Sequence, residues 1–136
     1  MALSYRDLEV WKKAIILIKD CYLISDRFPK TETYGISSQL KRSAISIAAN
    51  IAEGRSRNST KDFIRFLDIA YASLAETETH LIIAEELGYS SNESIEKALL
   101  QCAELWRMLN GLMNSLRQKF SDPRTLNPEP LEKEVQ

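Results

Sequence analysis

Few residues in the chain are suited to catalysis or metal binding, and they are scattered. The single histidine, His80, follows Glu76 by four residues, a spacing at which two side chains touch on one helix face. A di-iron bundle needs a Glu-x-x-His motif on each of two helices and two further glutamates, so this pair does not supply one. Cys21 and Cys102 form no C-x-x-C motif and lie in apolar helical patterns, so we interpret them as small core residues. No glycine-rich phosphate loop is present. We therefore expect no enzyme activity, metal site, cofactor or small-molecule substrate.

Positive charge is the second candidate feature, and it gathers around the segment "ANIAEGRSRNSTKDF" at Ala49–Phe63. The cluster consists of Lys41, Arg42, Arg55, Arg57, Lys61 and Arg65. The acidic residues near it are Glu53, Asp62 and Asp68. Such cations can contact the phosphates of a nucleic acid. They are equally typical of a solvated corner between two helices. No aromatic residues alternate with the charges in the turn, so stacking of single-stranded bases is not indicated.

The composition limits the class of protein. A chain of 136 residues with 44% hydrophobic content forms one domain with a substantial core. The net charge of −1 and the pI of about 5.9 require neither a nucleic acid nor an anionic membrane as partner. Residues 1–75 carry 12 basic and 8 acidic side chains, whereas residues 76–136 carry 6 and 11. This asymmetry indicates either an electropositive face or two halves that attract each other.

The opening "MALSYRDLEV" lacks the apolar stretch of a signal peptide, and the longest purely apolar run, Ala14–Ile18, is too short to span a bilayer. We expect a cytoplasmic protein without membrane contact.

Apolar residues recur every three or four positions, which predicts four helices. We place them at about Tyr5–Arg27 with Ser4 as N-cap, about Thr33–Glu53, from Ser59 or Thr60 to Leu87, and from Ser91 or Asn92 to Leu116. Gly54 is expected to end the second helix in the left-handed conformation, and Gly111 to mark close packing within the fourth. The fold class is therefore all-α, an up-down-up-down four-helix bundle over residues 1–120. Proline and charge dominate residues 121–136, where we expect a disordered tail.

Two further groups of residues bear on assembly. Polar side chains interrupt apolar faces at Ser46, Asn50, Ser73, Glu76 and Glu78. They can satisfy one another within the bundle or fix the register between protomers. Apolar residues lie outside the main stripes at Val10, Ile16, Leu17, Ile45, Ile64, Ile69, Tyr71, Ile82 and Ile83. A helix that is apolar on more than one face is buried on more than one face, which favours a closed homo-oligomer.

Three blocks of the sequence resemble one family. They are "YRDLEVWKKA" at Tyr5–Ala14, "FPKTETYGISSQLKRSAISIAANIAEG" at Phe28–Gly54 and "FIRFLDIAYASLAETETHLIIAEELGY" at Phe63–Tyr89. Over about residues 1–116 the chain resembles the four-helix-bundle proteins first known from open reading frames in intervening sequences of bacterial 23S rRNA genes. It is more distantly similar to the accessory variability determinant of diversity-generating retroelements, whose proteins bind nucleic acid and a reverse transcriptase as basic pentameric barrels.

The resemblance implies a four-helix bundle that forms a ring-like homopentamer without known enzymatic activity, with RNA binding supposed from the gene location. Within these blocks we assign Asn50, Glu53, Gly54 and Glu76 as structural motif residues. Thr77 stands where the family usually has an apolar residue, and Ala72 where glycine is common. The pI of about 5.9 weakens any transfer from the basic retroelement proteins. We expect binding of structured RNA or a nucleoprotein; the alternative is a protein-binding oligomeric adaptor without nucleic-acid contact.

Overall fold

The computed structural model describes residues 4–121. Its elements in chain order are the 3-10 helix η1 (Tyr5–Asp7), α1 (Glu9–Ser25), the 3-10 helix η2 (Lys30–Glu32), α2 (Ile36–Arg55), α3 (Thr60–Glu86) and α4 (Asn92–Ser121). Within this range there is no strand, so the all-α prediction is confirmed. The tail expected from residue 121 lies, apart from Ser121 itself, outside the described residues.

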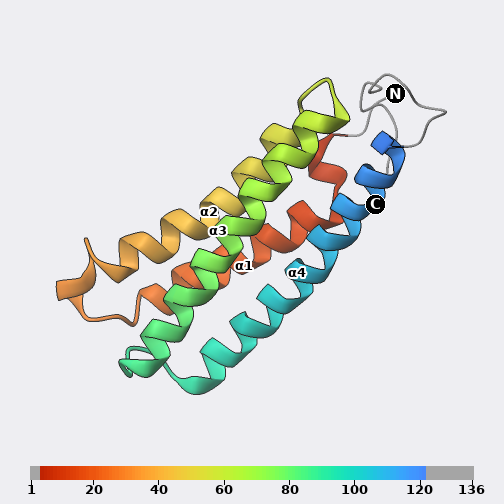
Figure 1. Cartoon of the computed structure of the whole chain (residues 1–136). Coiled ribbons are helices and arrows are strands. Elements are labelled where there is room, and N and C mark those ends of the chain that lie inside the picture. The colour runs from red at the N-terminus through yellow and green to blue at the C-terminus, as the bar shows by residue number, and fades with distance from the viewer. Residues whose placement is uncertain (1–3, 122–136) are drawn as a thin grey trace.

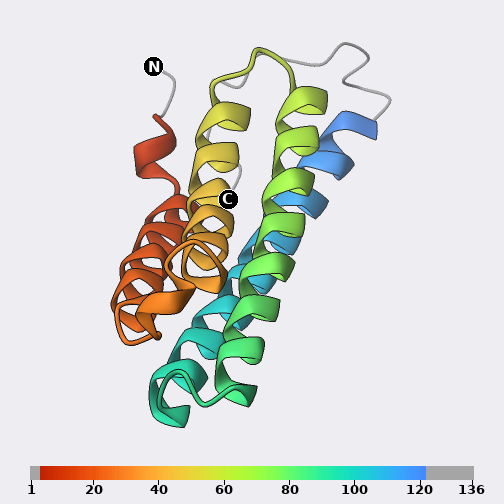
Figure 2. The same ribbon diagram turned by 90° about the vertical axis from the view of Figure 1, so that its left-hand side faces the viewer.

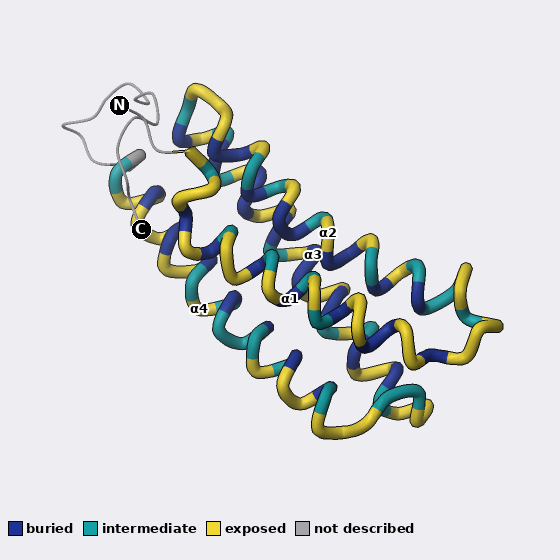
Figure 3. The backbone as a smooth tube through the Cα atoms, turned by 180° about the vertical axis from the view of Figure 1, so that it is seen from behind, coloured by how far each residue is buried: buried dark blue, intermediate teal, exposed yellow. Residues whose placement is uncertain are grey.

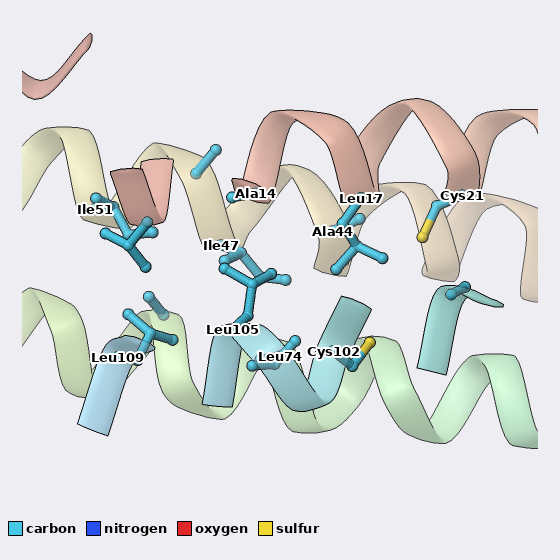
Figure 4. Packing of buried hydrophobic residues seen from close by; sticks show 14 of the residues in the cluster. Ala14, Leu17, Cys21, Ala44, Ile47, Ile51, Leu74, Cys102, Leu105 and Leu109 are labelled. Carbon is cyan, nitrogen blue, oxygen red and sulfur yellow. The ribbon is translucent and has the colours of Figure 1, made fainter. Parts of the chain in front are cut away.

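The four α-helices form an antiparallel bundle in which each helix reverses the direction of the one before it (Figure 1). Each packs against its two neighbours in the order α1, α2, α3, α4 and back to α1, and α2 with α3 is the most extensive pair (Figure 2). Buried positions follow the inner side of every helix (Figure 3). Leu17, Ile47, Leu74 and Leu105, one from each helix, are fully buried in a common core (Figure 4). Burial of each such side chain is worth about 1.5–3 kcal/mol.

The first predicted helix is broken near its start. Ser4 caps η1 rather than a long helix: its hydroxyl accepts from the Arg6 N–H at 3.1 Å, and the Asp7 carboxylate accepts from the Ser4 N–H at 3.2 Å. Leu8 follows in an extended conformation, and α1 begins at Glu9. This bend places the Leu8 side chain, 1% exposed, in the core. Core burial therefore prevails over the helical pattern at this position.

The N-terminus of α2 also differs from the prediction. Residues 30–32 form η2, and α2 starts at Ile36 instead of about Thr33. The Glu32 carboxylate accepts from the Ile36 N–H at 3.5 Å and from the Tyr89 hydroxyl at 3.0 Å. A carboxylate at this position is favoured by the helix dipole. Glu32 thus caps α2 and ties its start to the loop after α3.

The caps of the later helices agree with the sequence. The Ser59 hydroxyl accepts from the Asp62 N–H at 3.1 Å, so Ser59 rather than Thr60 is the N-cap of α3. The Ser91 hydroxyl accepts from the Ser94 N–H at 3.3 Å at the start of α4. Both serines satisfy N–H groups that the helix itself leaves without partners.

Gly54 does not end α2, and the prediction of a left-handed cap there is wrong. The helix continues through Gly54 to Arg55, and within residues 4–121 the positive-φ glycine is Gly88, at +71° after α3. A Cβ atom on Gly54 would lie 2.7 Å from Phe66 Cβ and 3.0 Å from Phe63 Cδ1. Glycine is therefore needed for the close approach of α2 to α3. At Gly111, where we expected close packing, an added Cβ would meet nothing within 4 Å.

The apolar residues outside the main stripes divide into two groups. Val10 and Leu17 are fully buried in the core of the single chain, and Ile64 and Tyr71 pack partly buried against that core. These residues need no second copy to cover them. The remaining members are 40–49% exposed and are Ile16, Ile45, Ile69, Ile82 and Ile83. Of the nine apolar residues outside the main stripes, these five isoleucines therefore remain available for contacts with a second copy.

Candidate nucleic-acid interface

The six basic residues of the predicted cluster do not form one patch. Arg55, Arg57, Lys61 and Arg65 surround the turn between α2 and α3. Lys41 and Arg42 lie in the first half of α2, 14 and 13 residues before Arg55. At a rise of 1.5 Å per residue this separation is about 20 Å. We call the group at the turn the basic corner and treat the other two residues separately.

Phe66 organises the basic corner. The guanidinium carbons of Arg57 and Arg65 lie 4.8 Å and 4.5 Å from its ring centroid. Phe66 is 7% exposed as a residue, yet it lies outside the main hydrophobic cluster of the bundle. Cation–π contacts of this length hold a guanidinium in place while its edge remains in water. Phe66 thus brings together one arginine from the turn after α2 and one from the start of α3.

Ion pairs neutralise the basic corner only in part. Arg57 Nη2 lies 2.7 Å from Glu53 Oε2, and Arg65 Nε lies 3.9 Å from Asp62 Oδ1. All four side chains are between 44% and 60% exposed, so each pair is weak and screened by salt. Glu53, assigned from the sequence as a structural motif residue, acts here by orienting Arg57.

The other two members of the basic corner differ in accessibility. Lys61 is exposed on the first turn of α3. Arg55 is 7% exposed and lies inside the turn, which is not the surface position expected of a phosphate contact. The accessible cations of the corner are therefore Arg57, Lys61 and Arg65.

Lys41 and Arg42 point away from each other. The Lys41 ammonium lies 5.0 Å from the ring centroid of Tyr22 on α1. Arg42 instead lines a groove on the outer side of α2 and α3, together with Glu76.

A line of polar side chains joins α2 to α3. Asn50 Nδ2 donates to the Ser46 carbonyl at 2.8 Å and to the Ser46 hydroxyl at 3.0 Å. The Ser46 hydroxyl lies 2.9 Å from that of Ser73. The hydroxyl of Thr77, 0% exposed, lies 2.9 Å from both the Ser43 hydroxyl and the Ser73 carbonyl. Ser46, Asn50 and Ser73 therefore satisfy one another within the chain, as the first sequence interpretation proposed, and the polar Thr77 is accommodated in the same way.

Glu78 and Glu76 have different surroundings. The Glu78 carboxylate accepts from Trp106 Nε1–H on α4 at 3.2 Å. Among the described residues Glu76 makes no ion pair, including with His80, the pair that the spacing suggested.

The two cysteines are free thiols with 0% exposure. Figure 4 shows both sulfur atoms inside the bundle among aliphatic side chains. Burial, with a smaller contribution from the other thiol and from Asp20, raises the pKa of Cys21 to about 12. Burial, with Glu78 contributing, raises the pKa of Cys102 to about 12. Both groups are therefore protonated at neutral pH and act as core residues.

Residues 4–121 contain neither a cluster of metal ligands nor a membrane-spanning helix. No group of three or more histidine, cysteine, aspartate or glutamate side chains is arranged to hold a metal ion in this part of the chain. Nor does any helix in the same residues have the length and apolar character needed to cross a bilayer.

The chain is similar to one known protein family and to a solved structure. Residues 6–111 match the family model described as 23S rRNA-intervening sequence protein. No curated protein matches the chain. A crystal structure from Bacteroides thetaiotaomicron, described as a protein with unknown function from the S23 ribosomal protein family, has a TM-score of 0.71 and 27% sequence identity. The alignment covers 76% of this chain and 97% of that one. Because the matched residues include all of α1, α2 and α3 and more than half of α4, the chain belongs to the 23S rRNA-intervening sequence protein family.

Proposed function

We propose that this protein is a non-enzymatic scaffold that binds structured RNA through its basic corner. The observation that carries the proposal is the placement of Arg57 and Arg65 against one Phe66 ring. Their planar guanidinium groups suit bidentate contacts to phosphate, and holding them in place lowers the entropy lost on binding. Lys61 adds a third exposed cation. The net charge of −1 means that attraction for RNA has to come from this local patch.

Assembly is the second part of the proposal. Three phosphate contacts from one chain give only weak binding. The logarithm of the binding constant then falls with the logarithm of the salt concentration with a slope of only about −2 to −3. A ring-like homopentamer, which the family resemblance implies, would present five copies of the corner and gain affinity through multivalency. The five exposed isoleucines supply apolar surface for contacts between copies.

RNA binding is tested by salt titration against a structured RNA hairpin. The wild-type protein is expected to bind, and the doubly substituted Arg57→Glu, Arg65→Glu protein to lose at least about tenfold in affinity and part of its salt slope. The matched control is Lys19→Glu with Arg107→Glu, which changes the net charge equally at exposed positions on α1 and α4. Equal losses in both variants, or no binding at about 50 mM salt, would contradict the RNA proposal and favour the protein-binding adaptor.

Assembly is tested by native mass measurement. We expect five times the chain mass of 15.5 kDa for the wild type. Ile69→Ser with Ile83→Ser on α3 should reduce that mass, because it removes apolar contact area between copies. Leu100→Ser on α4, which alters a side chain that is 72% exposed, is the control and should leave the mass unchanged. A wild-type monomer would refute the pentamer.

A further inference from the structure

A pocket of about 140 Å³ opens on the outer side of the α1–α4 pair, and we call it the α1–α4 pocket. Its walls come from the end of α1, the turn after it and the start of α4, and they consist of Asp20, Leu23, Ile24, Arg27, Ser94 and Lys97. A protein cavity of about 150 Å³ holds a benzene ring. Because Leu23 is 65% exposed, apolar wall surface of this pocket faces water in the single chain. The pocket therefore has the size and the walls to accept one aromatic side chain.

The polar groups around the α1–α4 pocket suit a tyrosine. Lys97 Nζ lies 4.0 Å from Asp20 Oδ2, and Arg27 Nη1 lies 3.5 Å from Ser94 Oγ. Cations beside an aromatic face are attracted to it. The Asp20 carboxylate accepts from Gln101 Nε2 at 2.6 Å and has further acceptor positions for a phenol O–H.

Tyr34 lies on the other side of the molecule, at the rim of the groove that Arg42 and Glu76 line. It is 95% exposed, the most exposed large hydrophobic side chain among the described residues. Its turn is anchored by Glu32, which caps α2 and accepts from the Tyr89 hydroxyl. An aromatic side chain on an anchored turn is typical of the residues that dominate the affinity of protein interfaces. Within its own chain the Tyr34 ring covers almost no apolar surface.

Tyr34 and the α1–α4 pocket lie at the same end of the bundle. Tyr34 belongs to the turn that joins α1 to α2, and the pocket is built where α1 ends and α4 begins (Figure 1). The helices pack in the order α1, α2, α3, α4 and back to α1, so the α2–α3 side and the α1–α4 side are opposite. Two copies placed side by side with parallel axes therefore bring Tyr34 of one level with the pocket of the other.

Exposed aliphatic side chains extend both of these sides. On α1, Ile16 lies seven residues before Leu23 of the pocket wall. On α3, Ile69 and Ile83 lie seven residues before and after Glu76, which lines the groove beside Tyr34. Residues seven apart fall on one line of a helix. Each side thus carries apolar surface along more than two helical turns, in addition to the Tyr34 ring or the pocket.

We propose that Tyr34 of one copy inserts into the α1–α4 pocket of the next copy, an inference that rests on the assembly in the proposed function. The contact joins two different surfaces. Such a contact generates a ring when the rotation between copies closes, whereas a two-fold dimer joins a surface to itself.

This contact leaves the basic corner accessible. All copies in a ring have the same orientation, so the basic corners gather at one end of the ring. The Tyr34 contact lies at the other end, separated by the 20 residues of α2, or about 30 Å. The α2–α3 side is covered, while Arg57, Lys61 and Arg65 stay at the free end.

The first experiment is disulfide cross-linking between two single variants, Tyr34→Cys and Leu23→Cys, each expressed alone and then together. Cys21 and Cys102 are fully buried and do not compete. We expect no cross-link in either variant alone and covalent dimers when the two are co-expressed. The matched control replaces Leu23→Cys by Arg107→Cys, exposed on α4 ten residues after Lys97, or about 15 Å along the helix, and should give no dimer. Dimers in Tyr34→Cys alone, or none in the mixture, overturn the proposal.

The second experiment follows the mass of the assembly as the protein is diluted. Tyr34→Ala should raise the dissociation constant between copies at least about 30-fold, the effect of losing an aromatic interface anchor. Tyr34→Phe keeps the ring and should raise it by no more than about fivefold. Because Tyr34 is 95% exposed, neither change should unfold the single chain. Leu100 does not line the pocket, so Leu100→Ser remains a control here as well.

The outcomes separate this inference from the function on which it rests. A wild-type assembly that Tyr34→Ala leaves unchanged refutes the Tyr34 contact while the proposed pentamer stands. A wild-type monomer refutes both. Cross-linking as expected in a protein that does not bind the RNA hairpin supports the contact and refutes only the proposed RNA binding.

Discussion

Gly54→Ala tests whether the close approach of α2 to α3 requires glycine. The new Cβ would lie 2.7 Å from Phe66 Cβ, and reaching an ordinary contact of 3.4 Å requires a displacement of about 0.7 Å. The atom in the way adjoins the backbone of α3, so a side-chain rotation cannot relieve the overlap and the helix has to move.

The expected size of the effect combines two opposing contributions. Alanine inside a helix is favoured over glycine by about 1 kcal/mol. Overpacking costs about 1–3 kcal/mol, and we take the upper half of that range because a helix must shift rather than a flexible side chain. Gly54→Ala should therefore lower the free energy of unfolding by about 1–2 kcal/mol net. For a domain of this size that is a fall in Tm of roughly 3–10 °C.

Gly111→Ala is the matched control, because Gly111 also lies within a helix but an added Cβ meets nothing within 4 Å. It should raise the free energy of unfolding by about 1 kcal/mol through helix propensity alone. Both variants are compared with the wild type by urea and thermal unfolding at one protein concentration, since assembly makes Tm depend on concentration. The reasoning fails if Gly54→Ala stabilises the protein as much as Gly111→Ala does.

Two further predictions concern buried groups. Thr77→Val should cost about 1–2 kcal/mol of unfolding free energy, because it removes one of the two hydrogen bonds of the buried Ser43 hydroxyl, which keeps only its bond to the Leu40 carbonyl. Thr79→Val, on the exposed side of α3, should stay within about 0.5 kcal/mol, and similar urea midpoints for the two variants would count against the buried network. For the thiols, the folded pKa values of about 12 exceed the ordinary value of 9.0, so the native chain keeps protons that the unfolded chain loses. This contribution to stability is complete below pH 9 and is lost as pH rises toward 12. Urea midpoints at about pH 8 and about pH 10.5 should therefore differ less when Cys21 and Cys102 are both alanine, and an unchanged difference would exclude a contribution from the thiols.

Periodicity predicted the four helices and their order because each helix needs one apolar face for the core. The cap at Ser59 could also be predicted, since it depends on a side chain and an N–H only three residues apart. The break at Leu8 could not, because leucine fits a helical stripe and only its burial against other helices shows that the chain bends. The cap of α2 was missed for a similar reason: Glu32 is held there partly by Tyr89, 57 residues away in sequence.

The candidate site was predicted less well than the fold, since closeness in sequence is a poor guide to closeness on a long helix. Lys41 and Arg42 were grouped with the turn, yet the rise of α2 carries them about 20 Å away. Arg55 was counted as a surface cation, although it is 7% exposed. Phe66 was not among the residues predicted for the site. Its position directly after Arg65 was the available signal that it could support the arginines of the turn.

Gly54 and the basic corner are linked through Phe66. The Cβ of Phe66 is the atom nearest to the missing side chain of Gly54, and its ring carries Arg57 and Arg65. Because Gly54 lets α2 approach α3 at this point, the ring lies within reach of one cation from the turn after α2 and one from α3. Any larger residue at position 54 would move the ring relative to Arg57, which follows only three residues later. The glycine that appeared from the sequence to be a helix terminator is thus the residue that sets the spacing of the proposed RNA contacts.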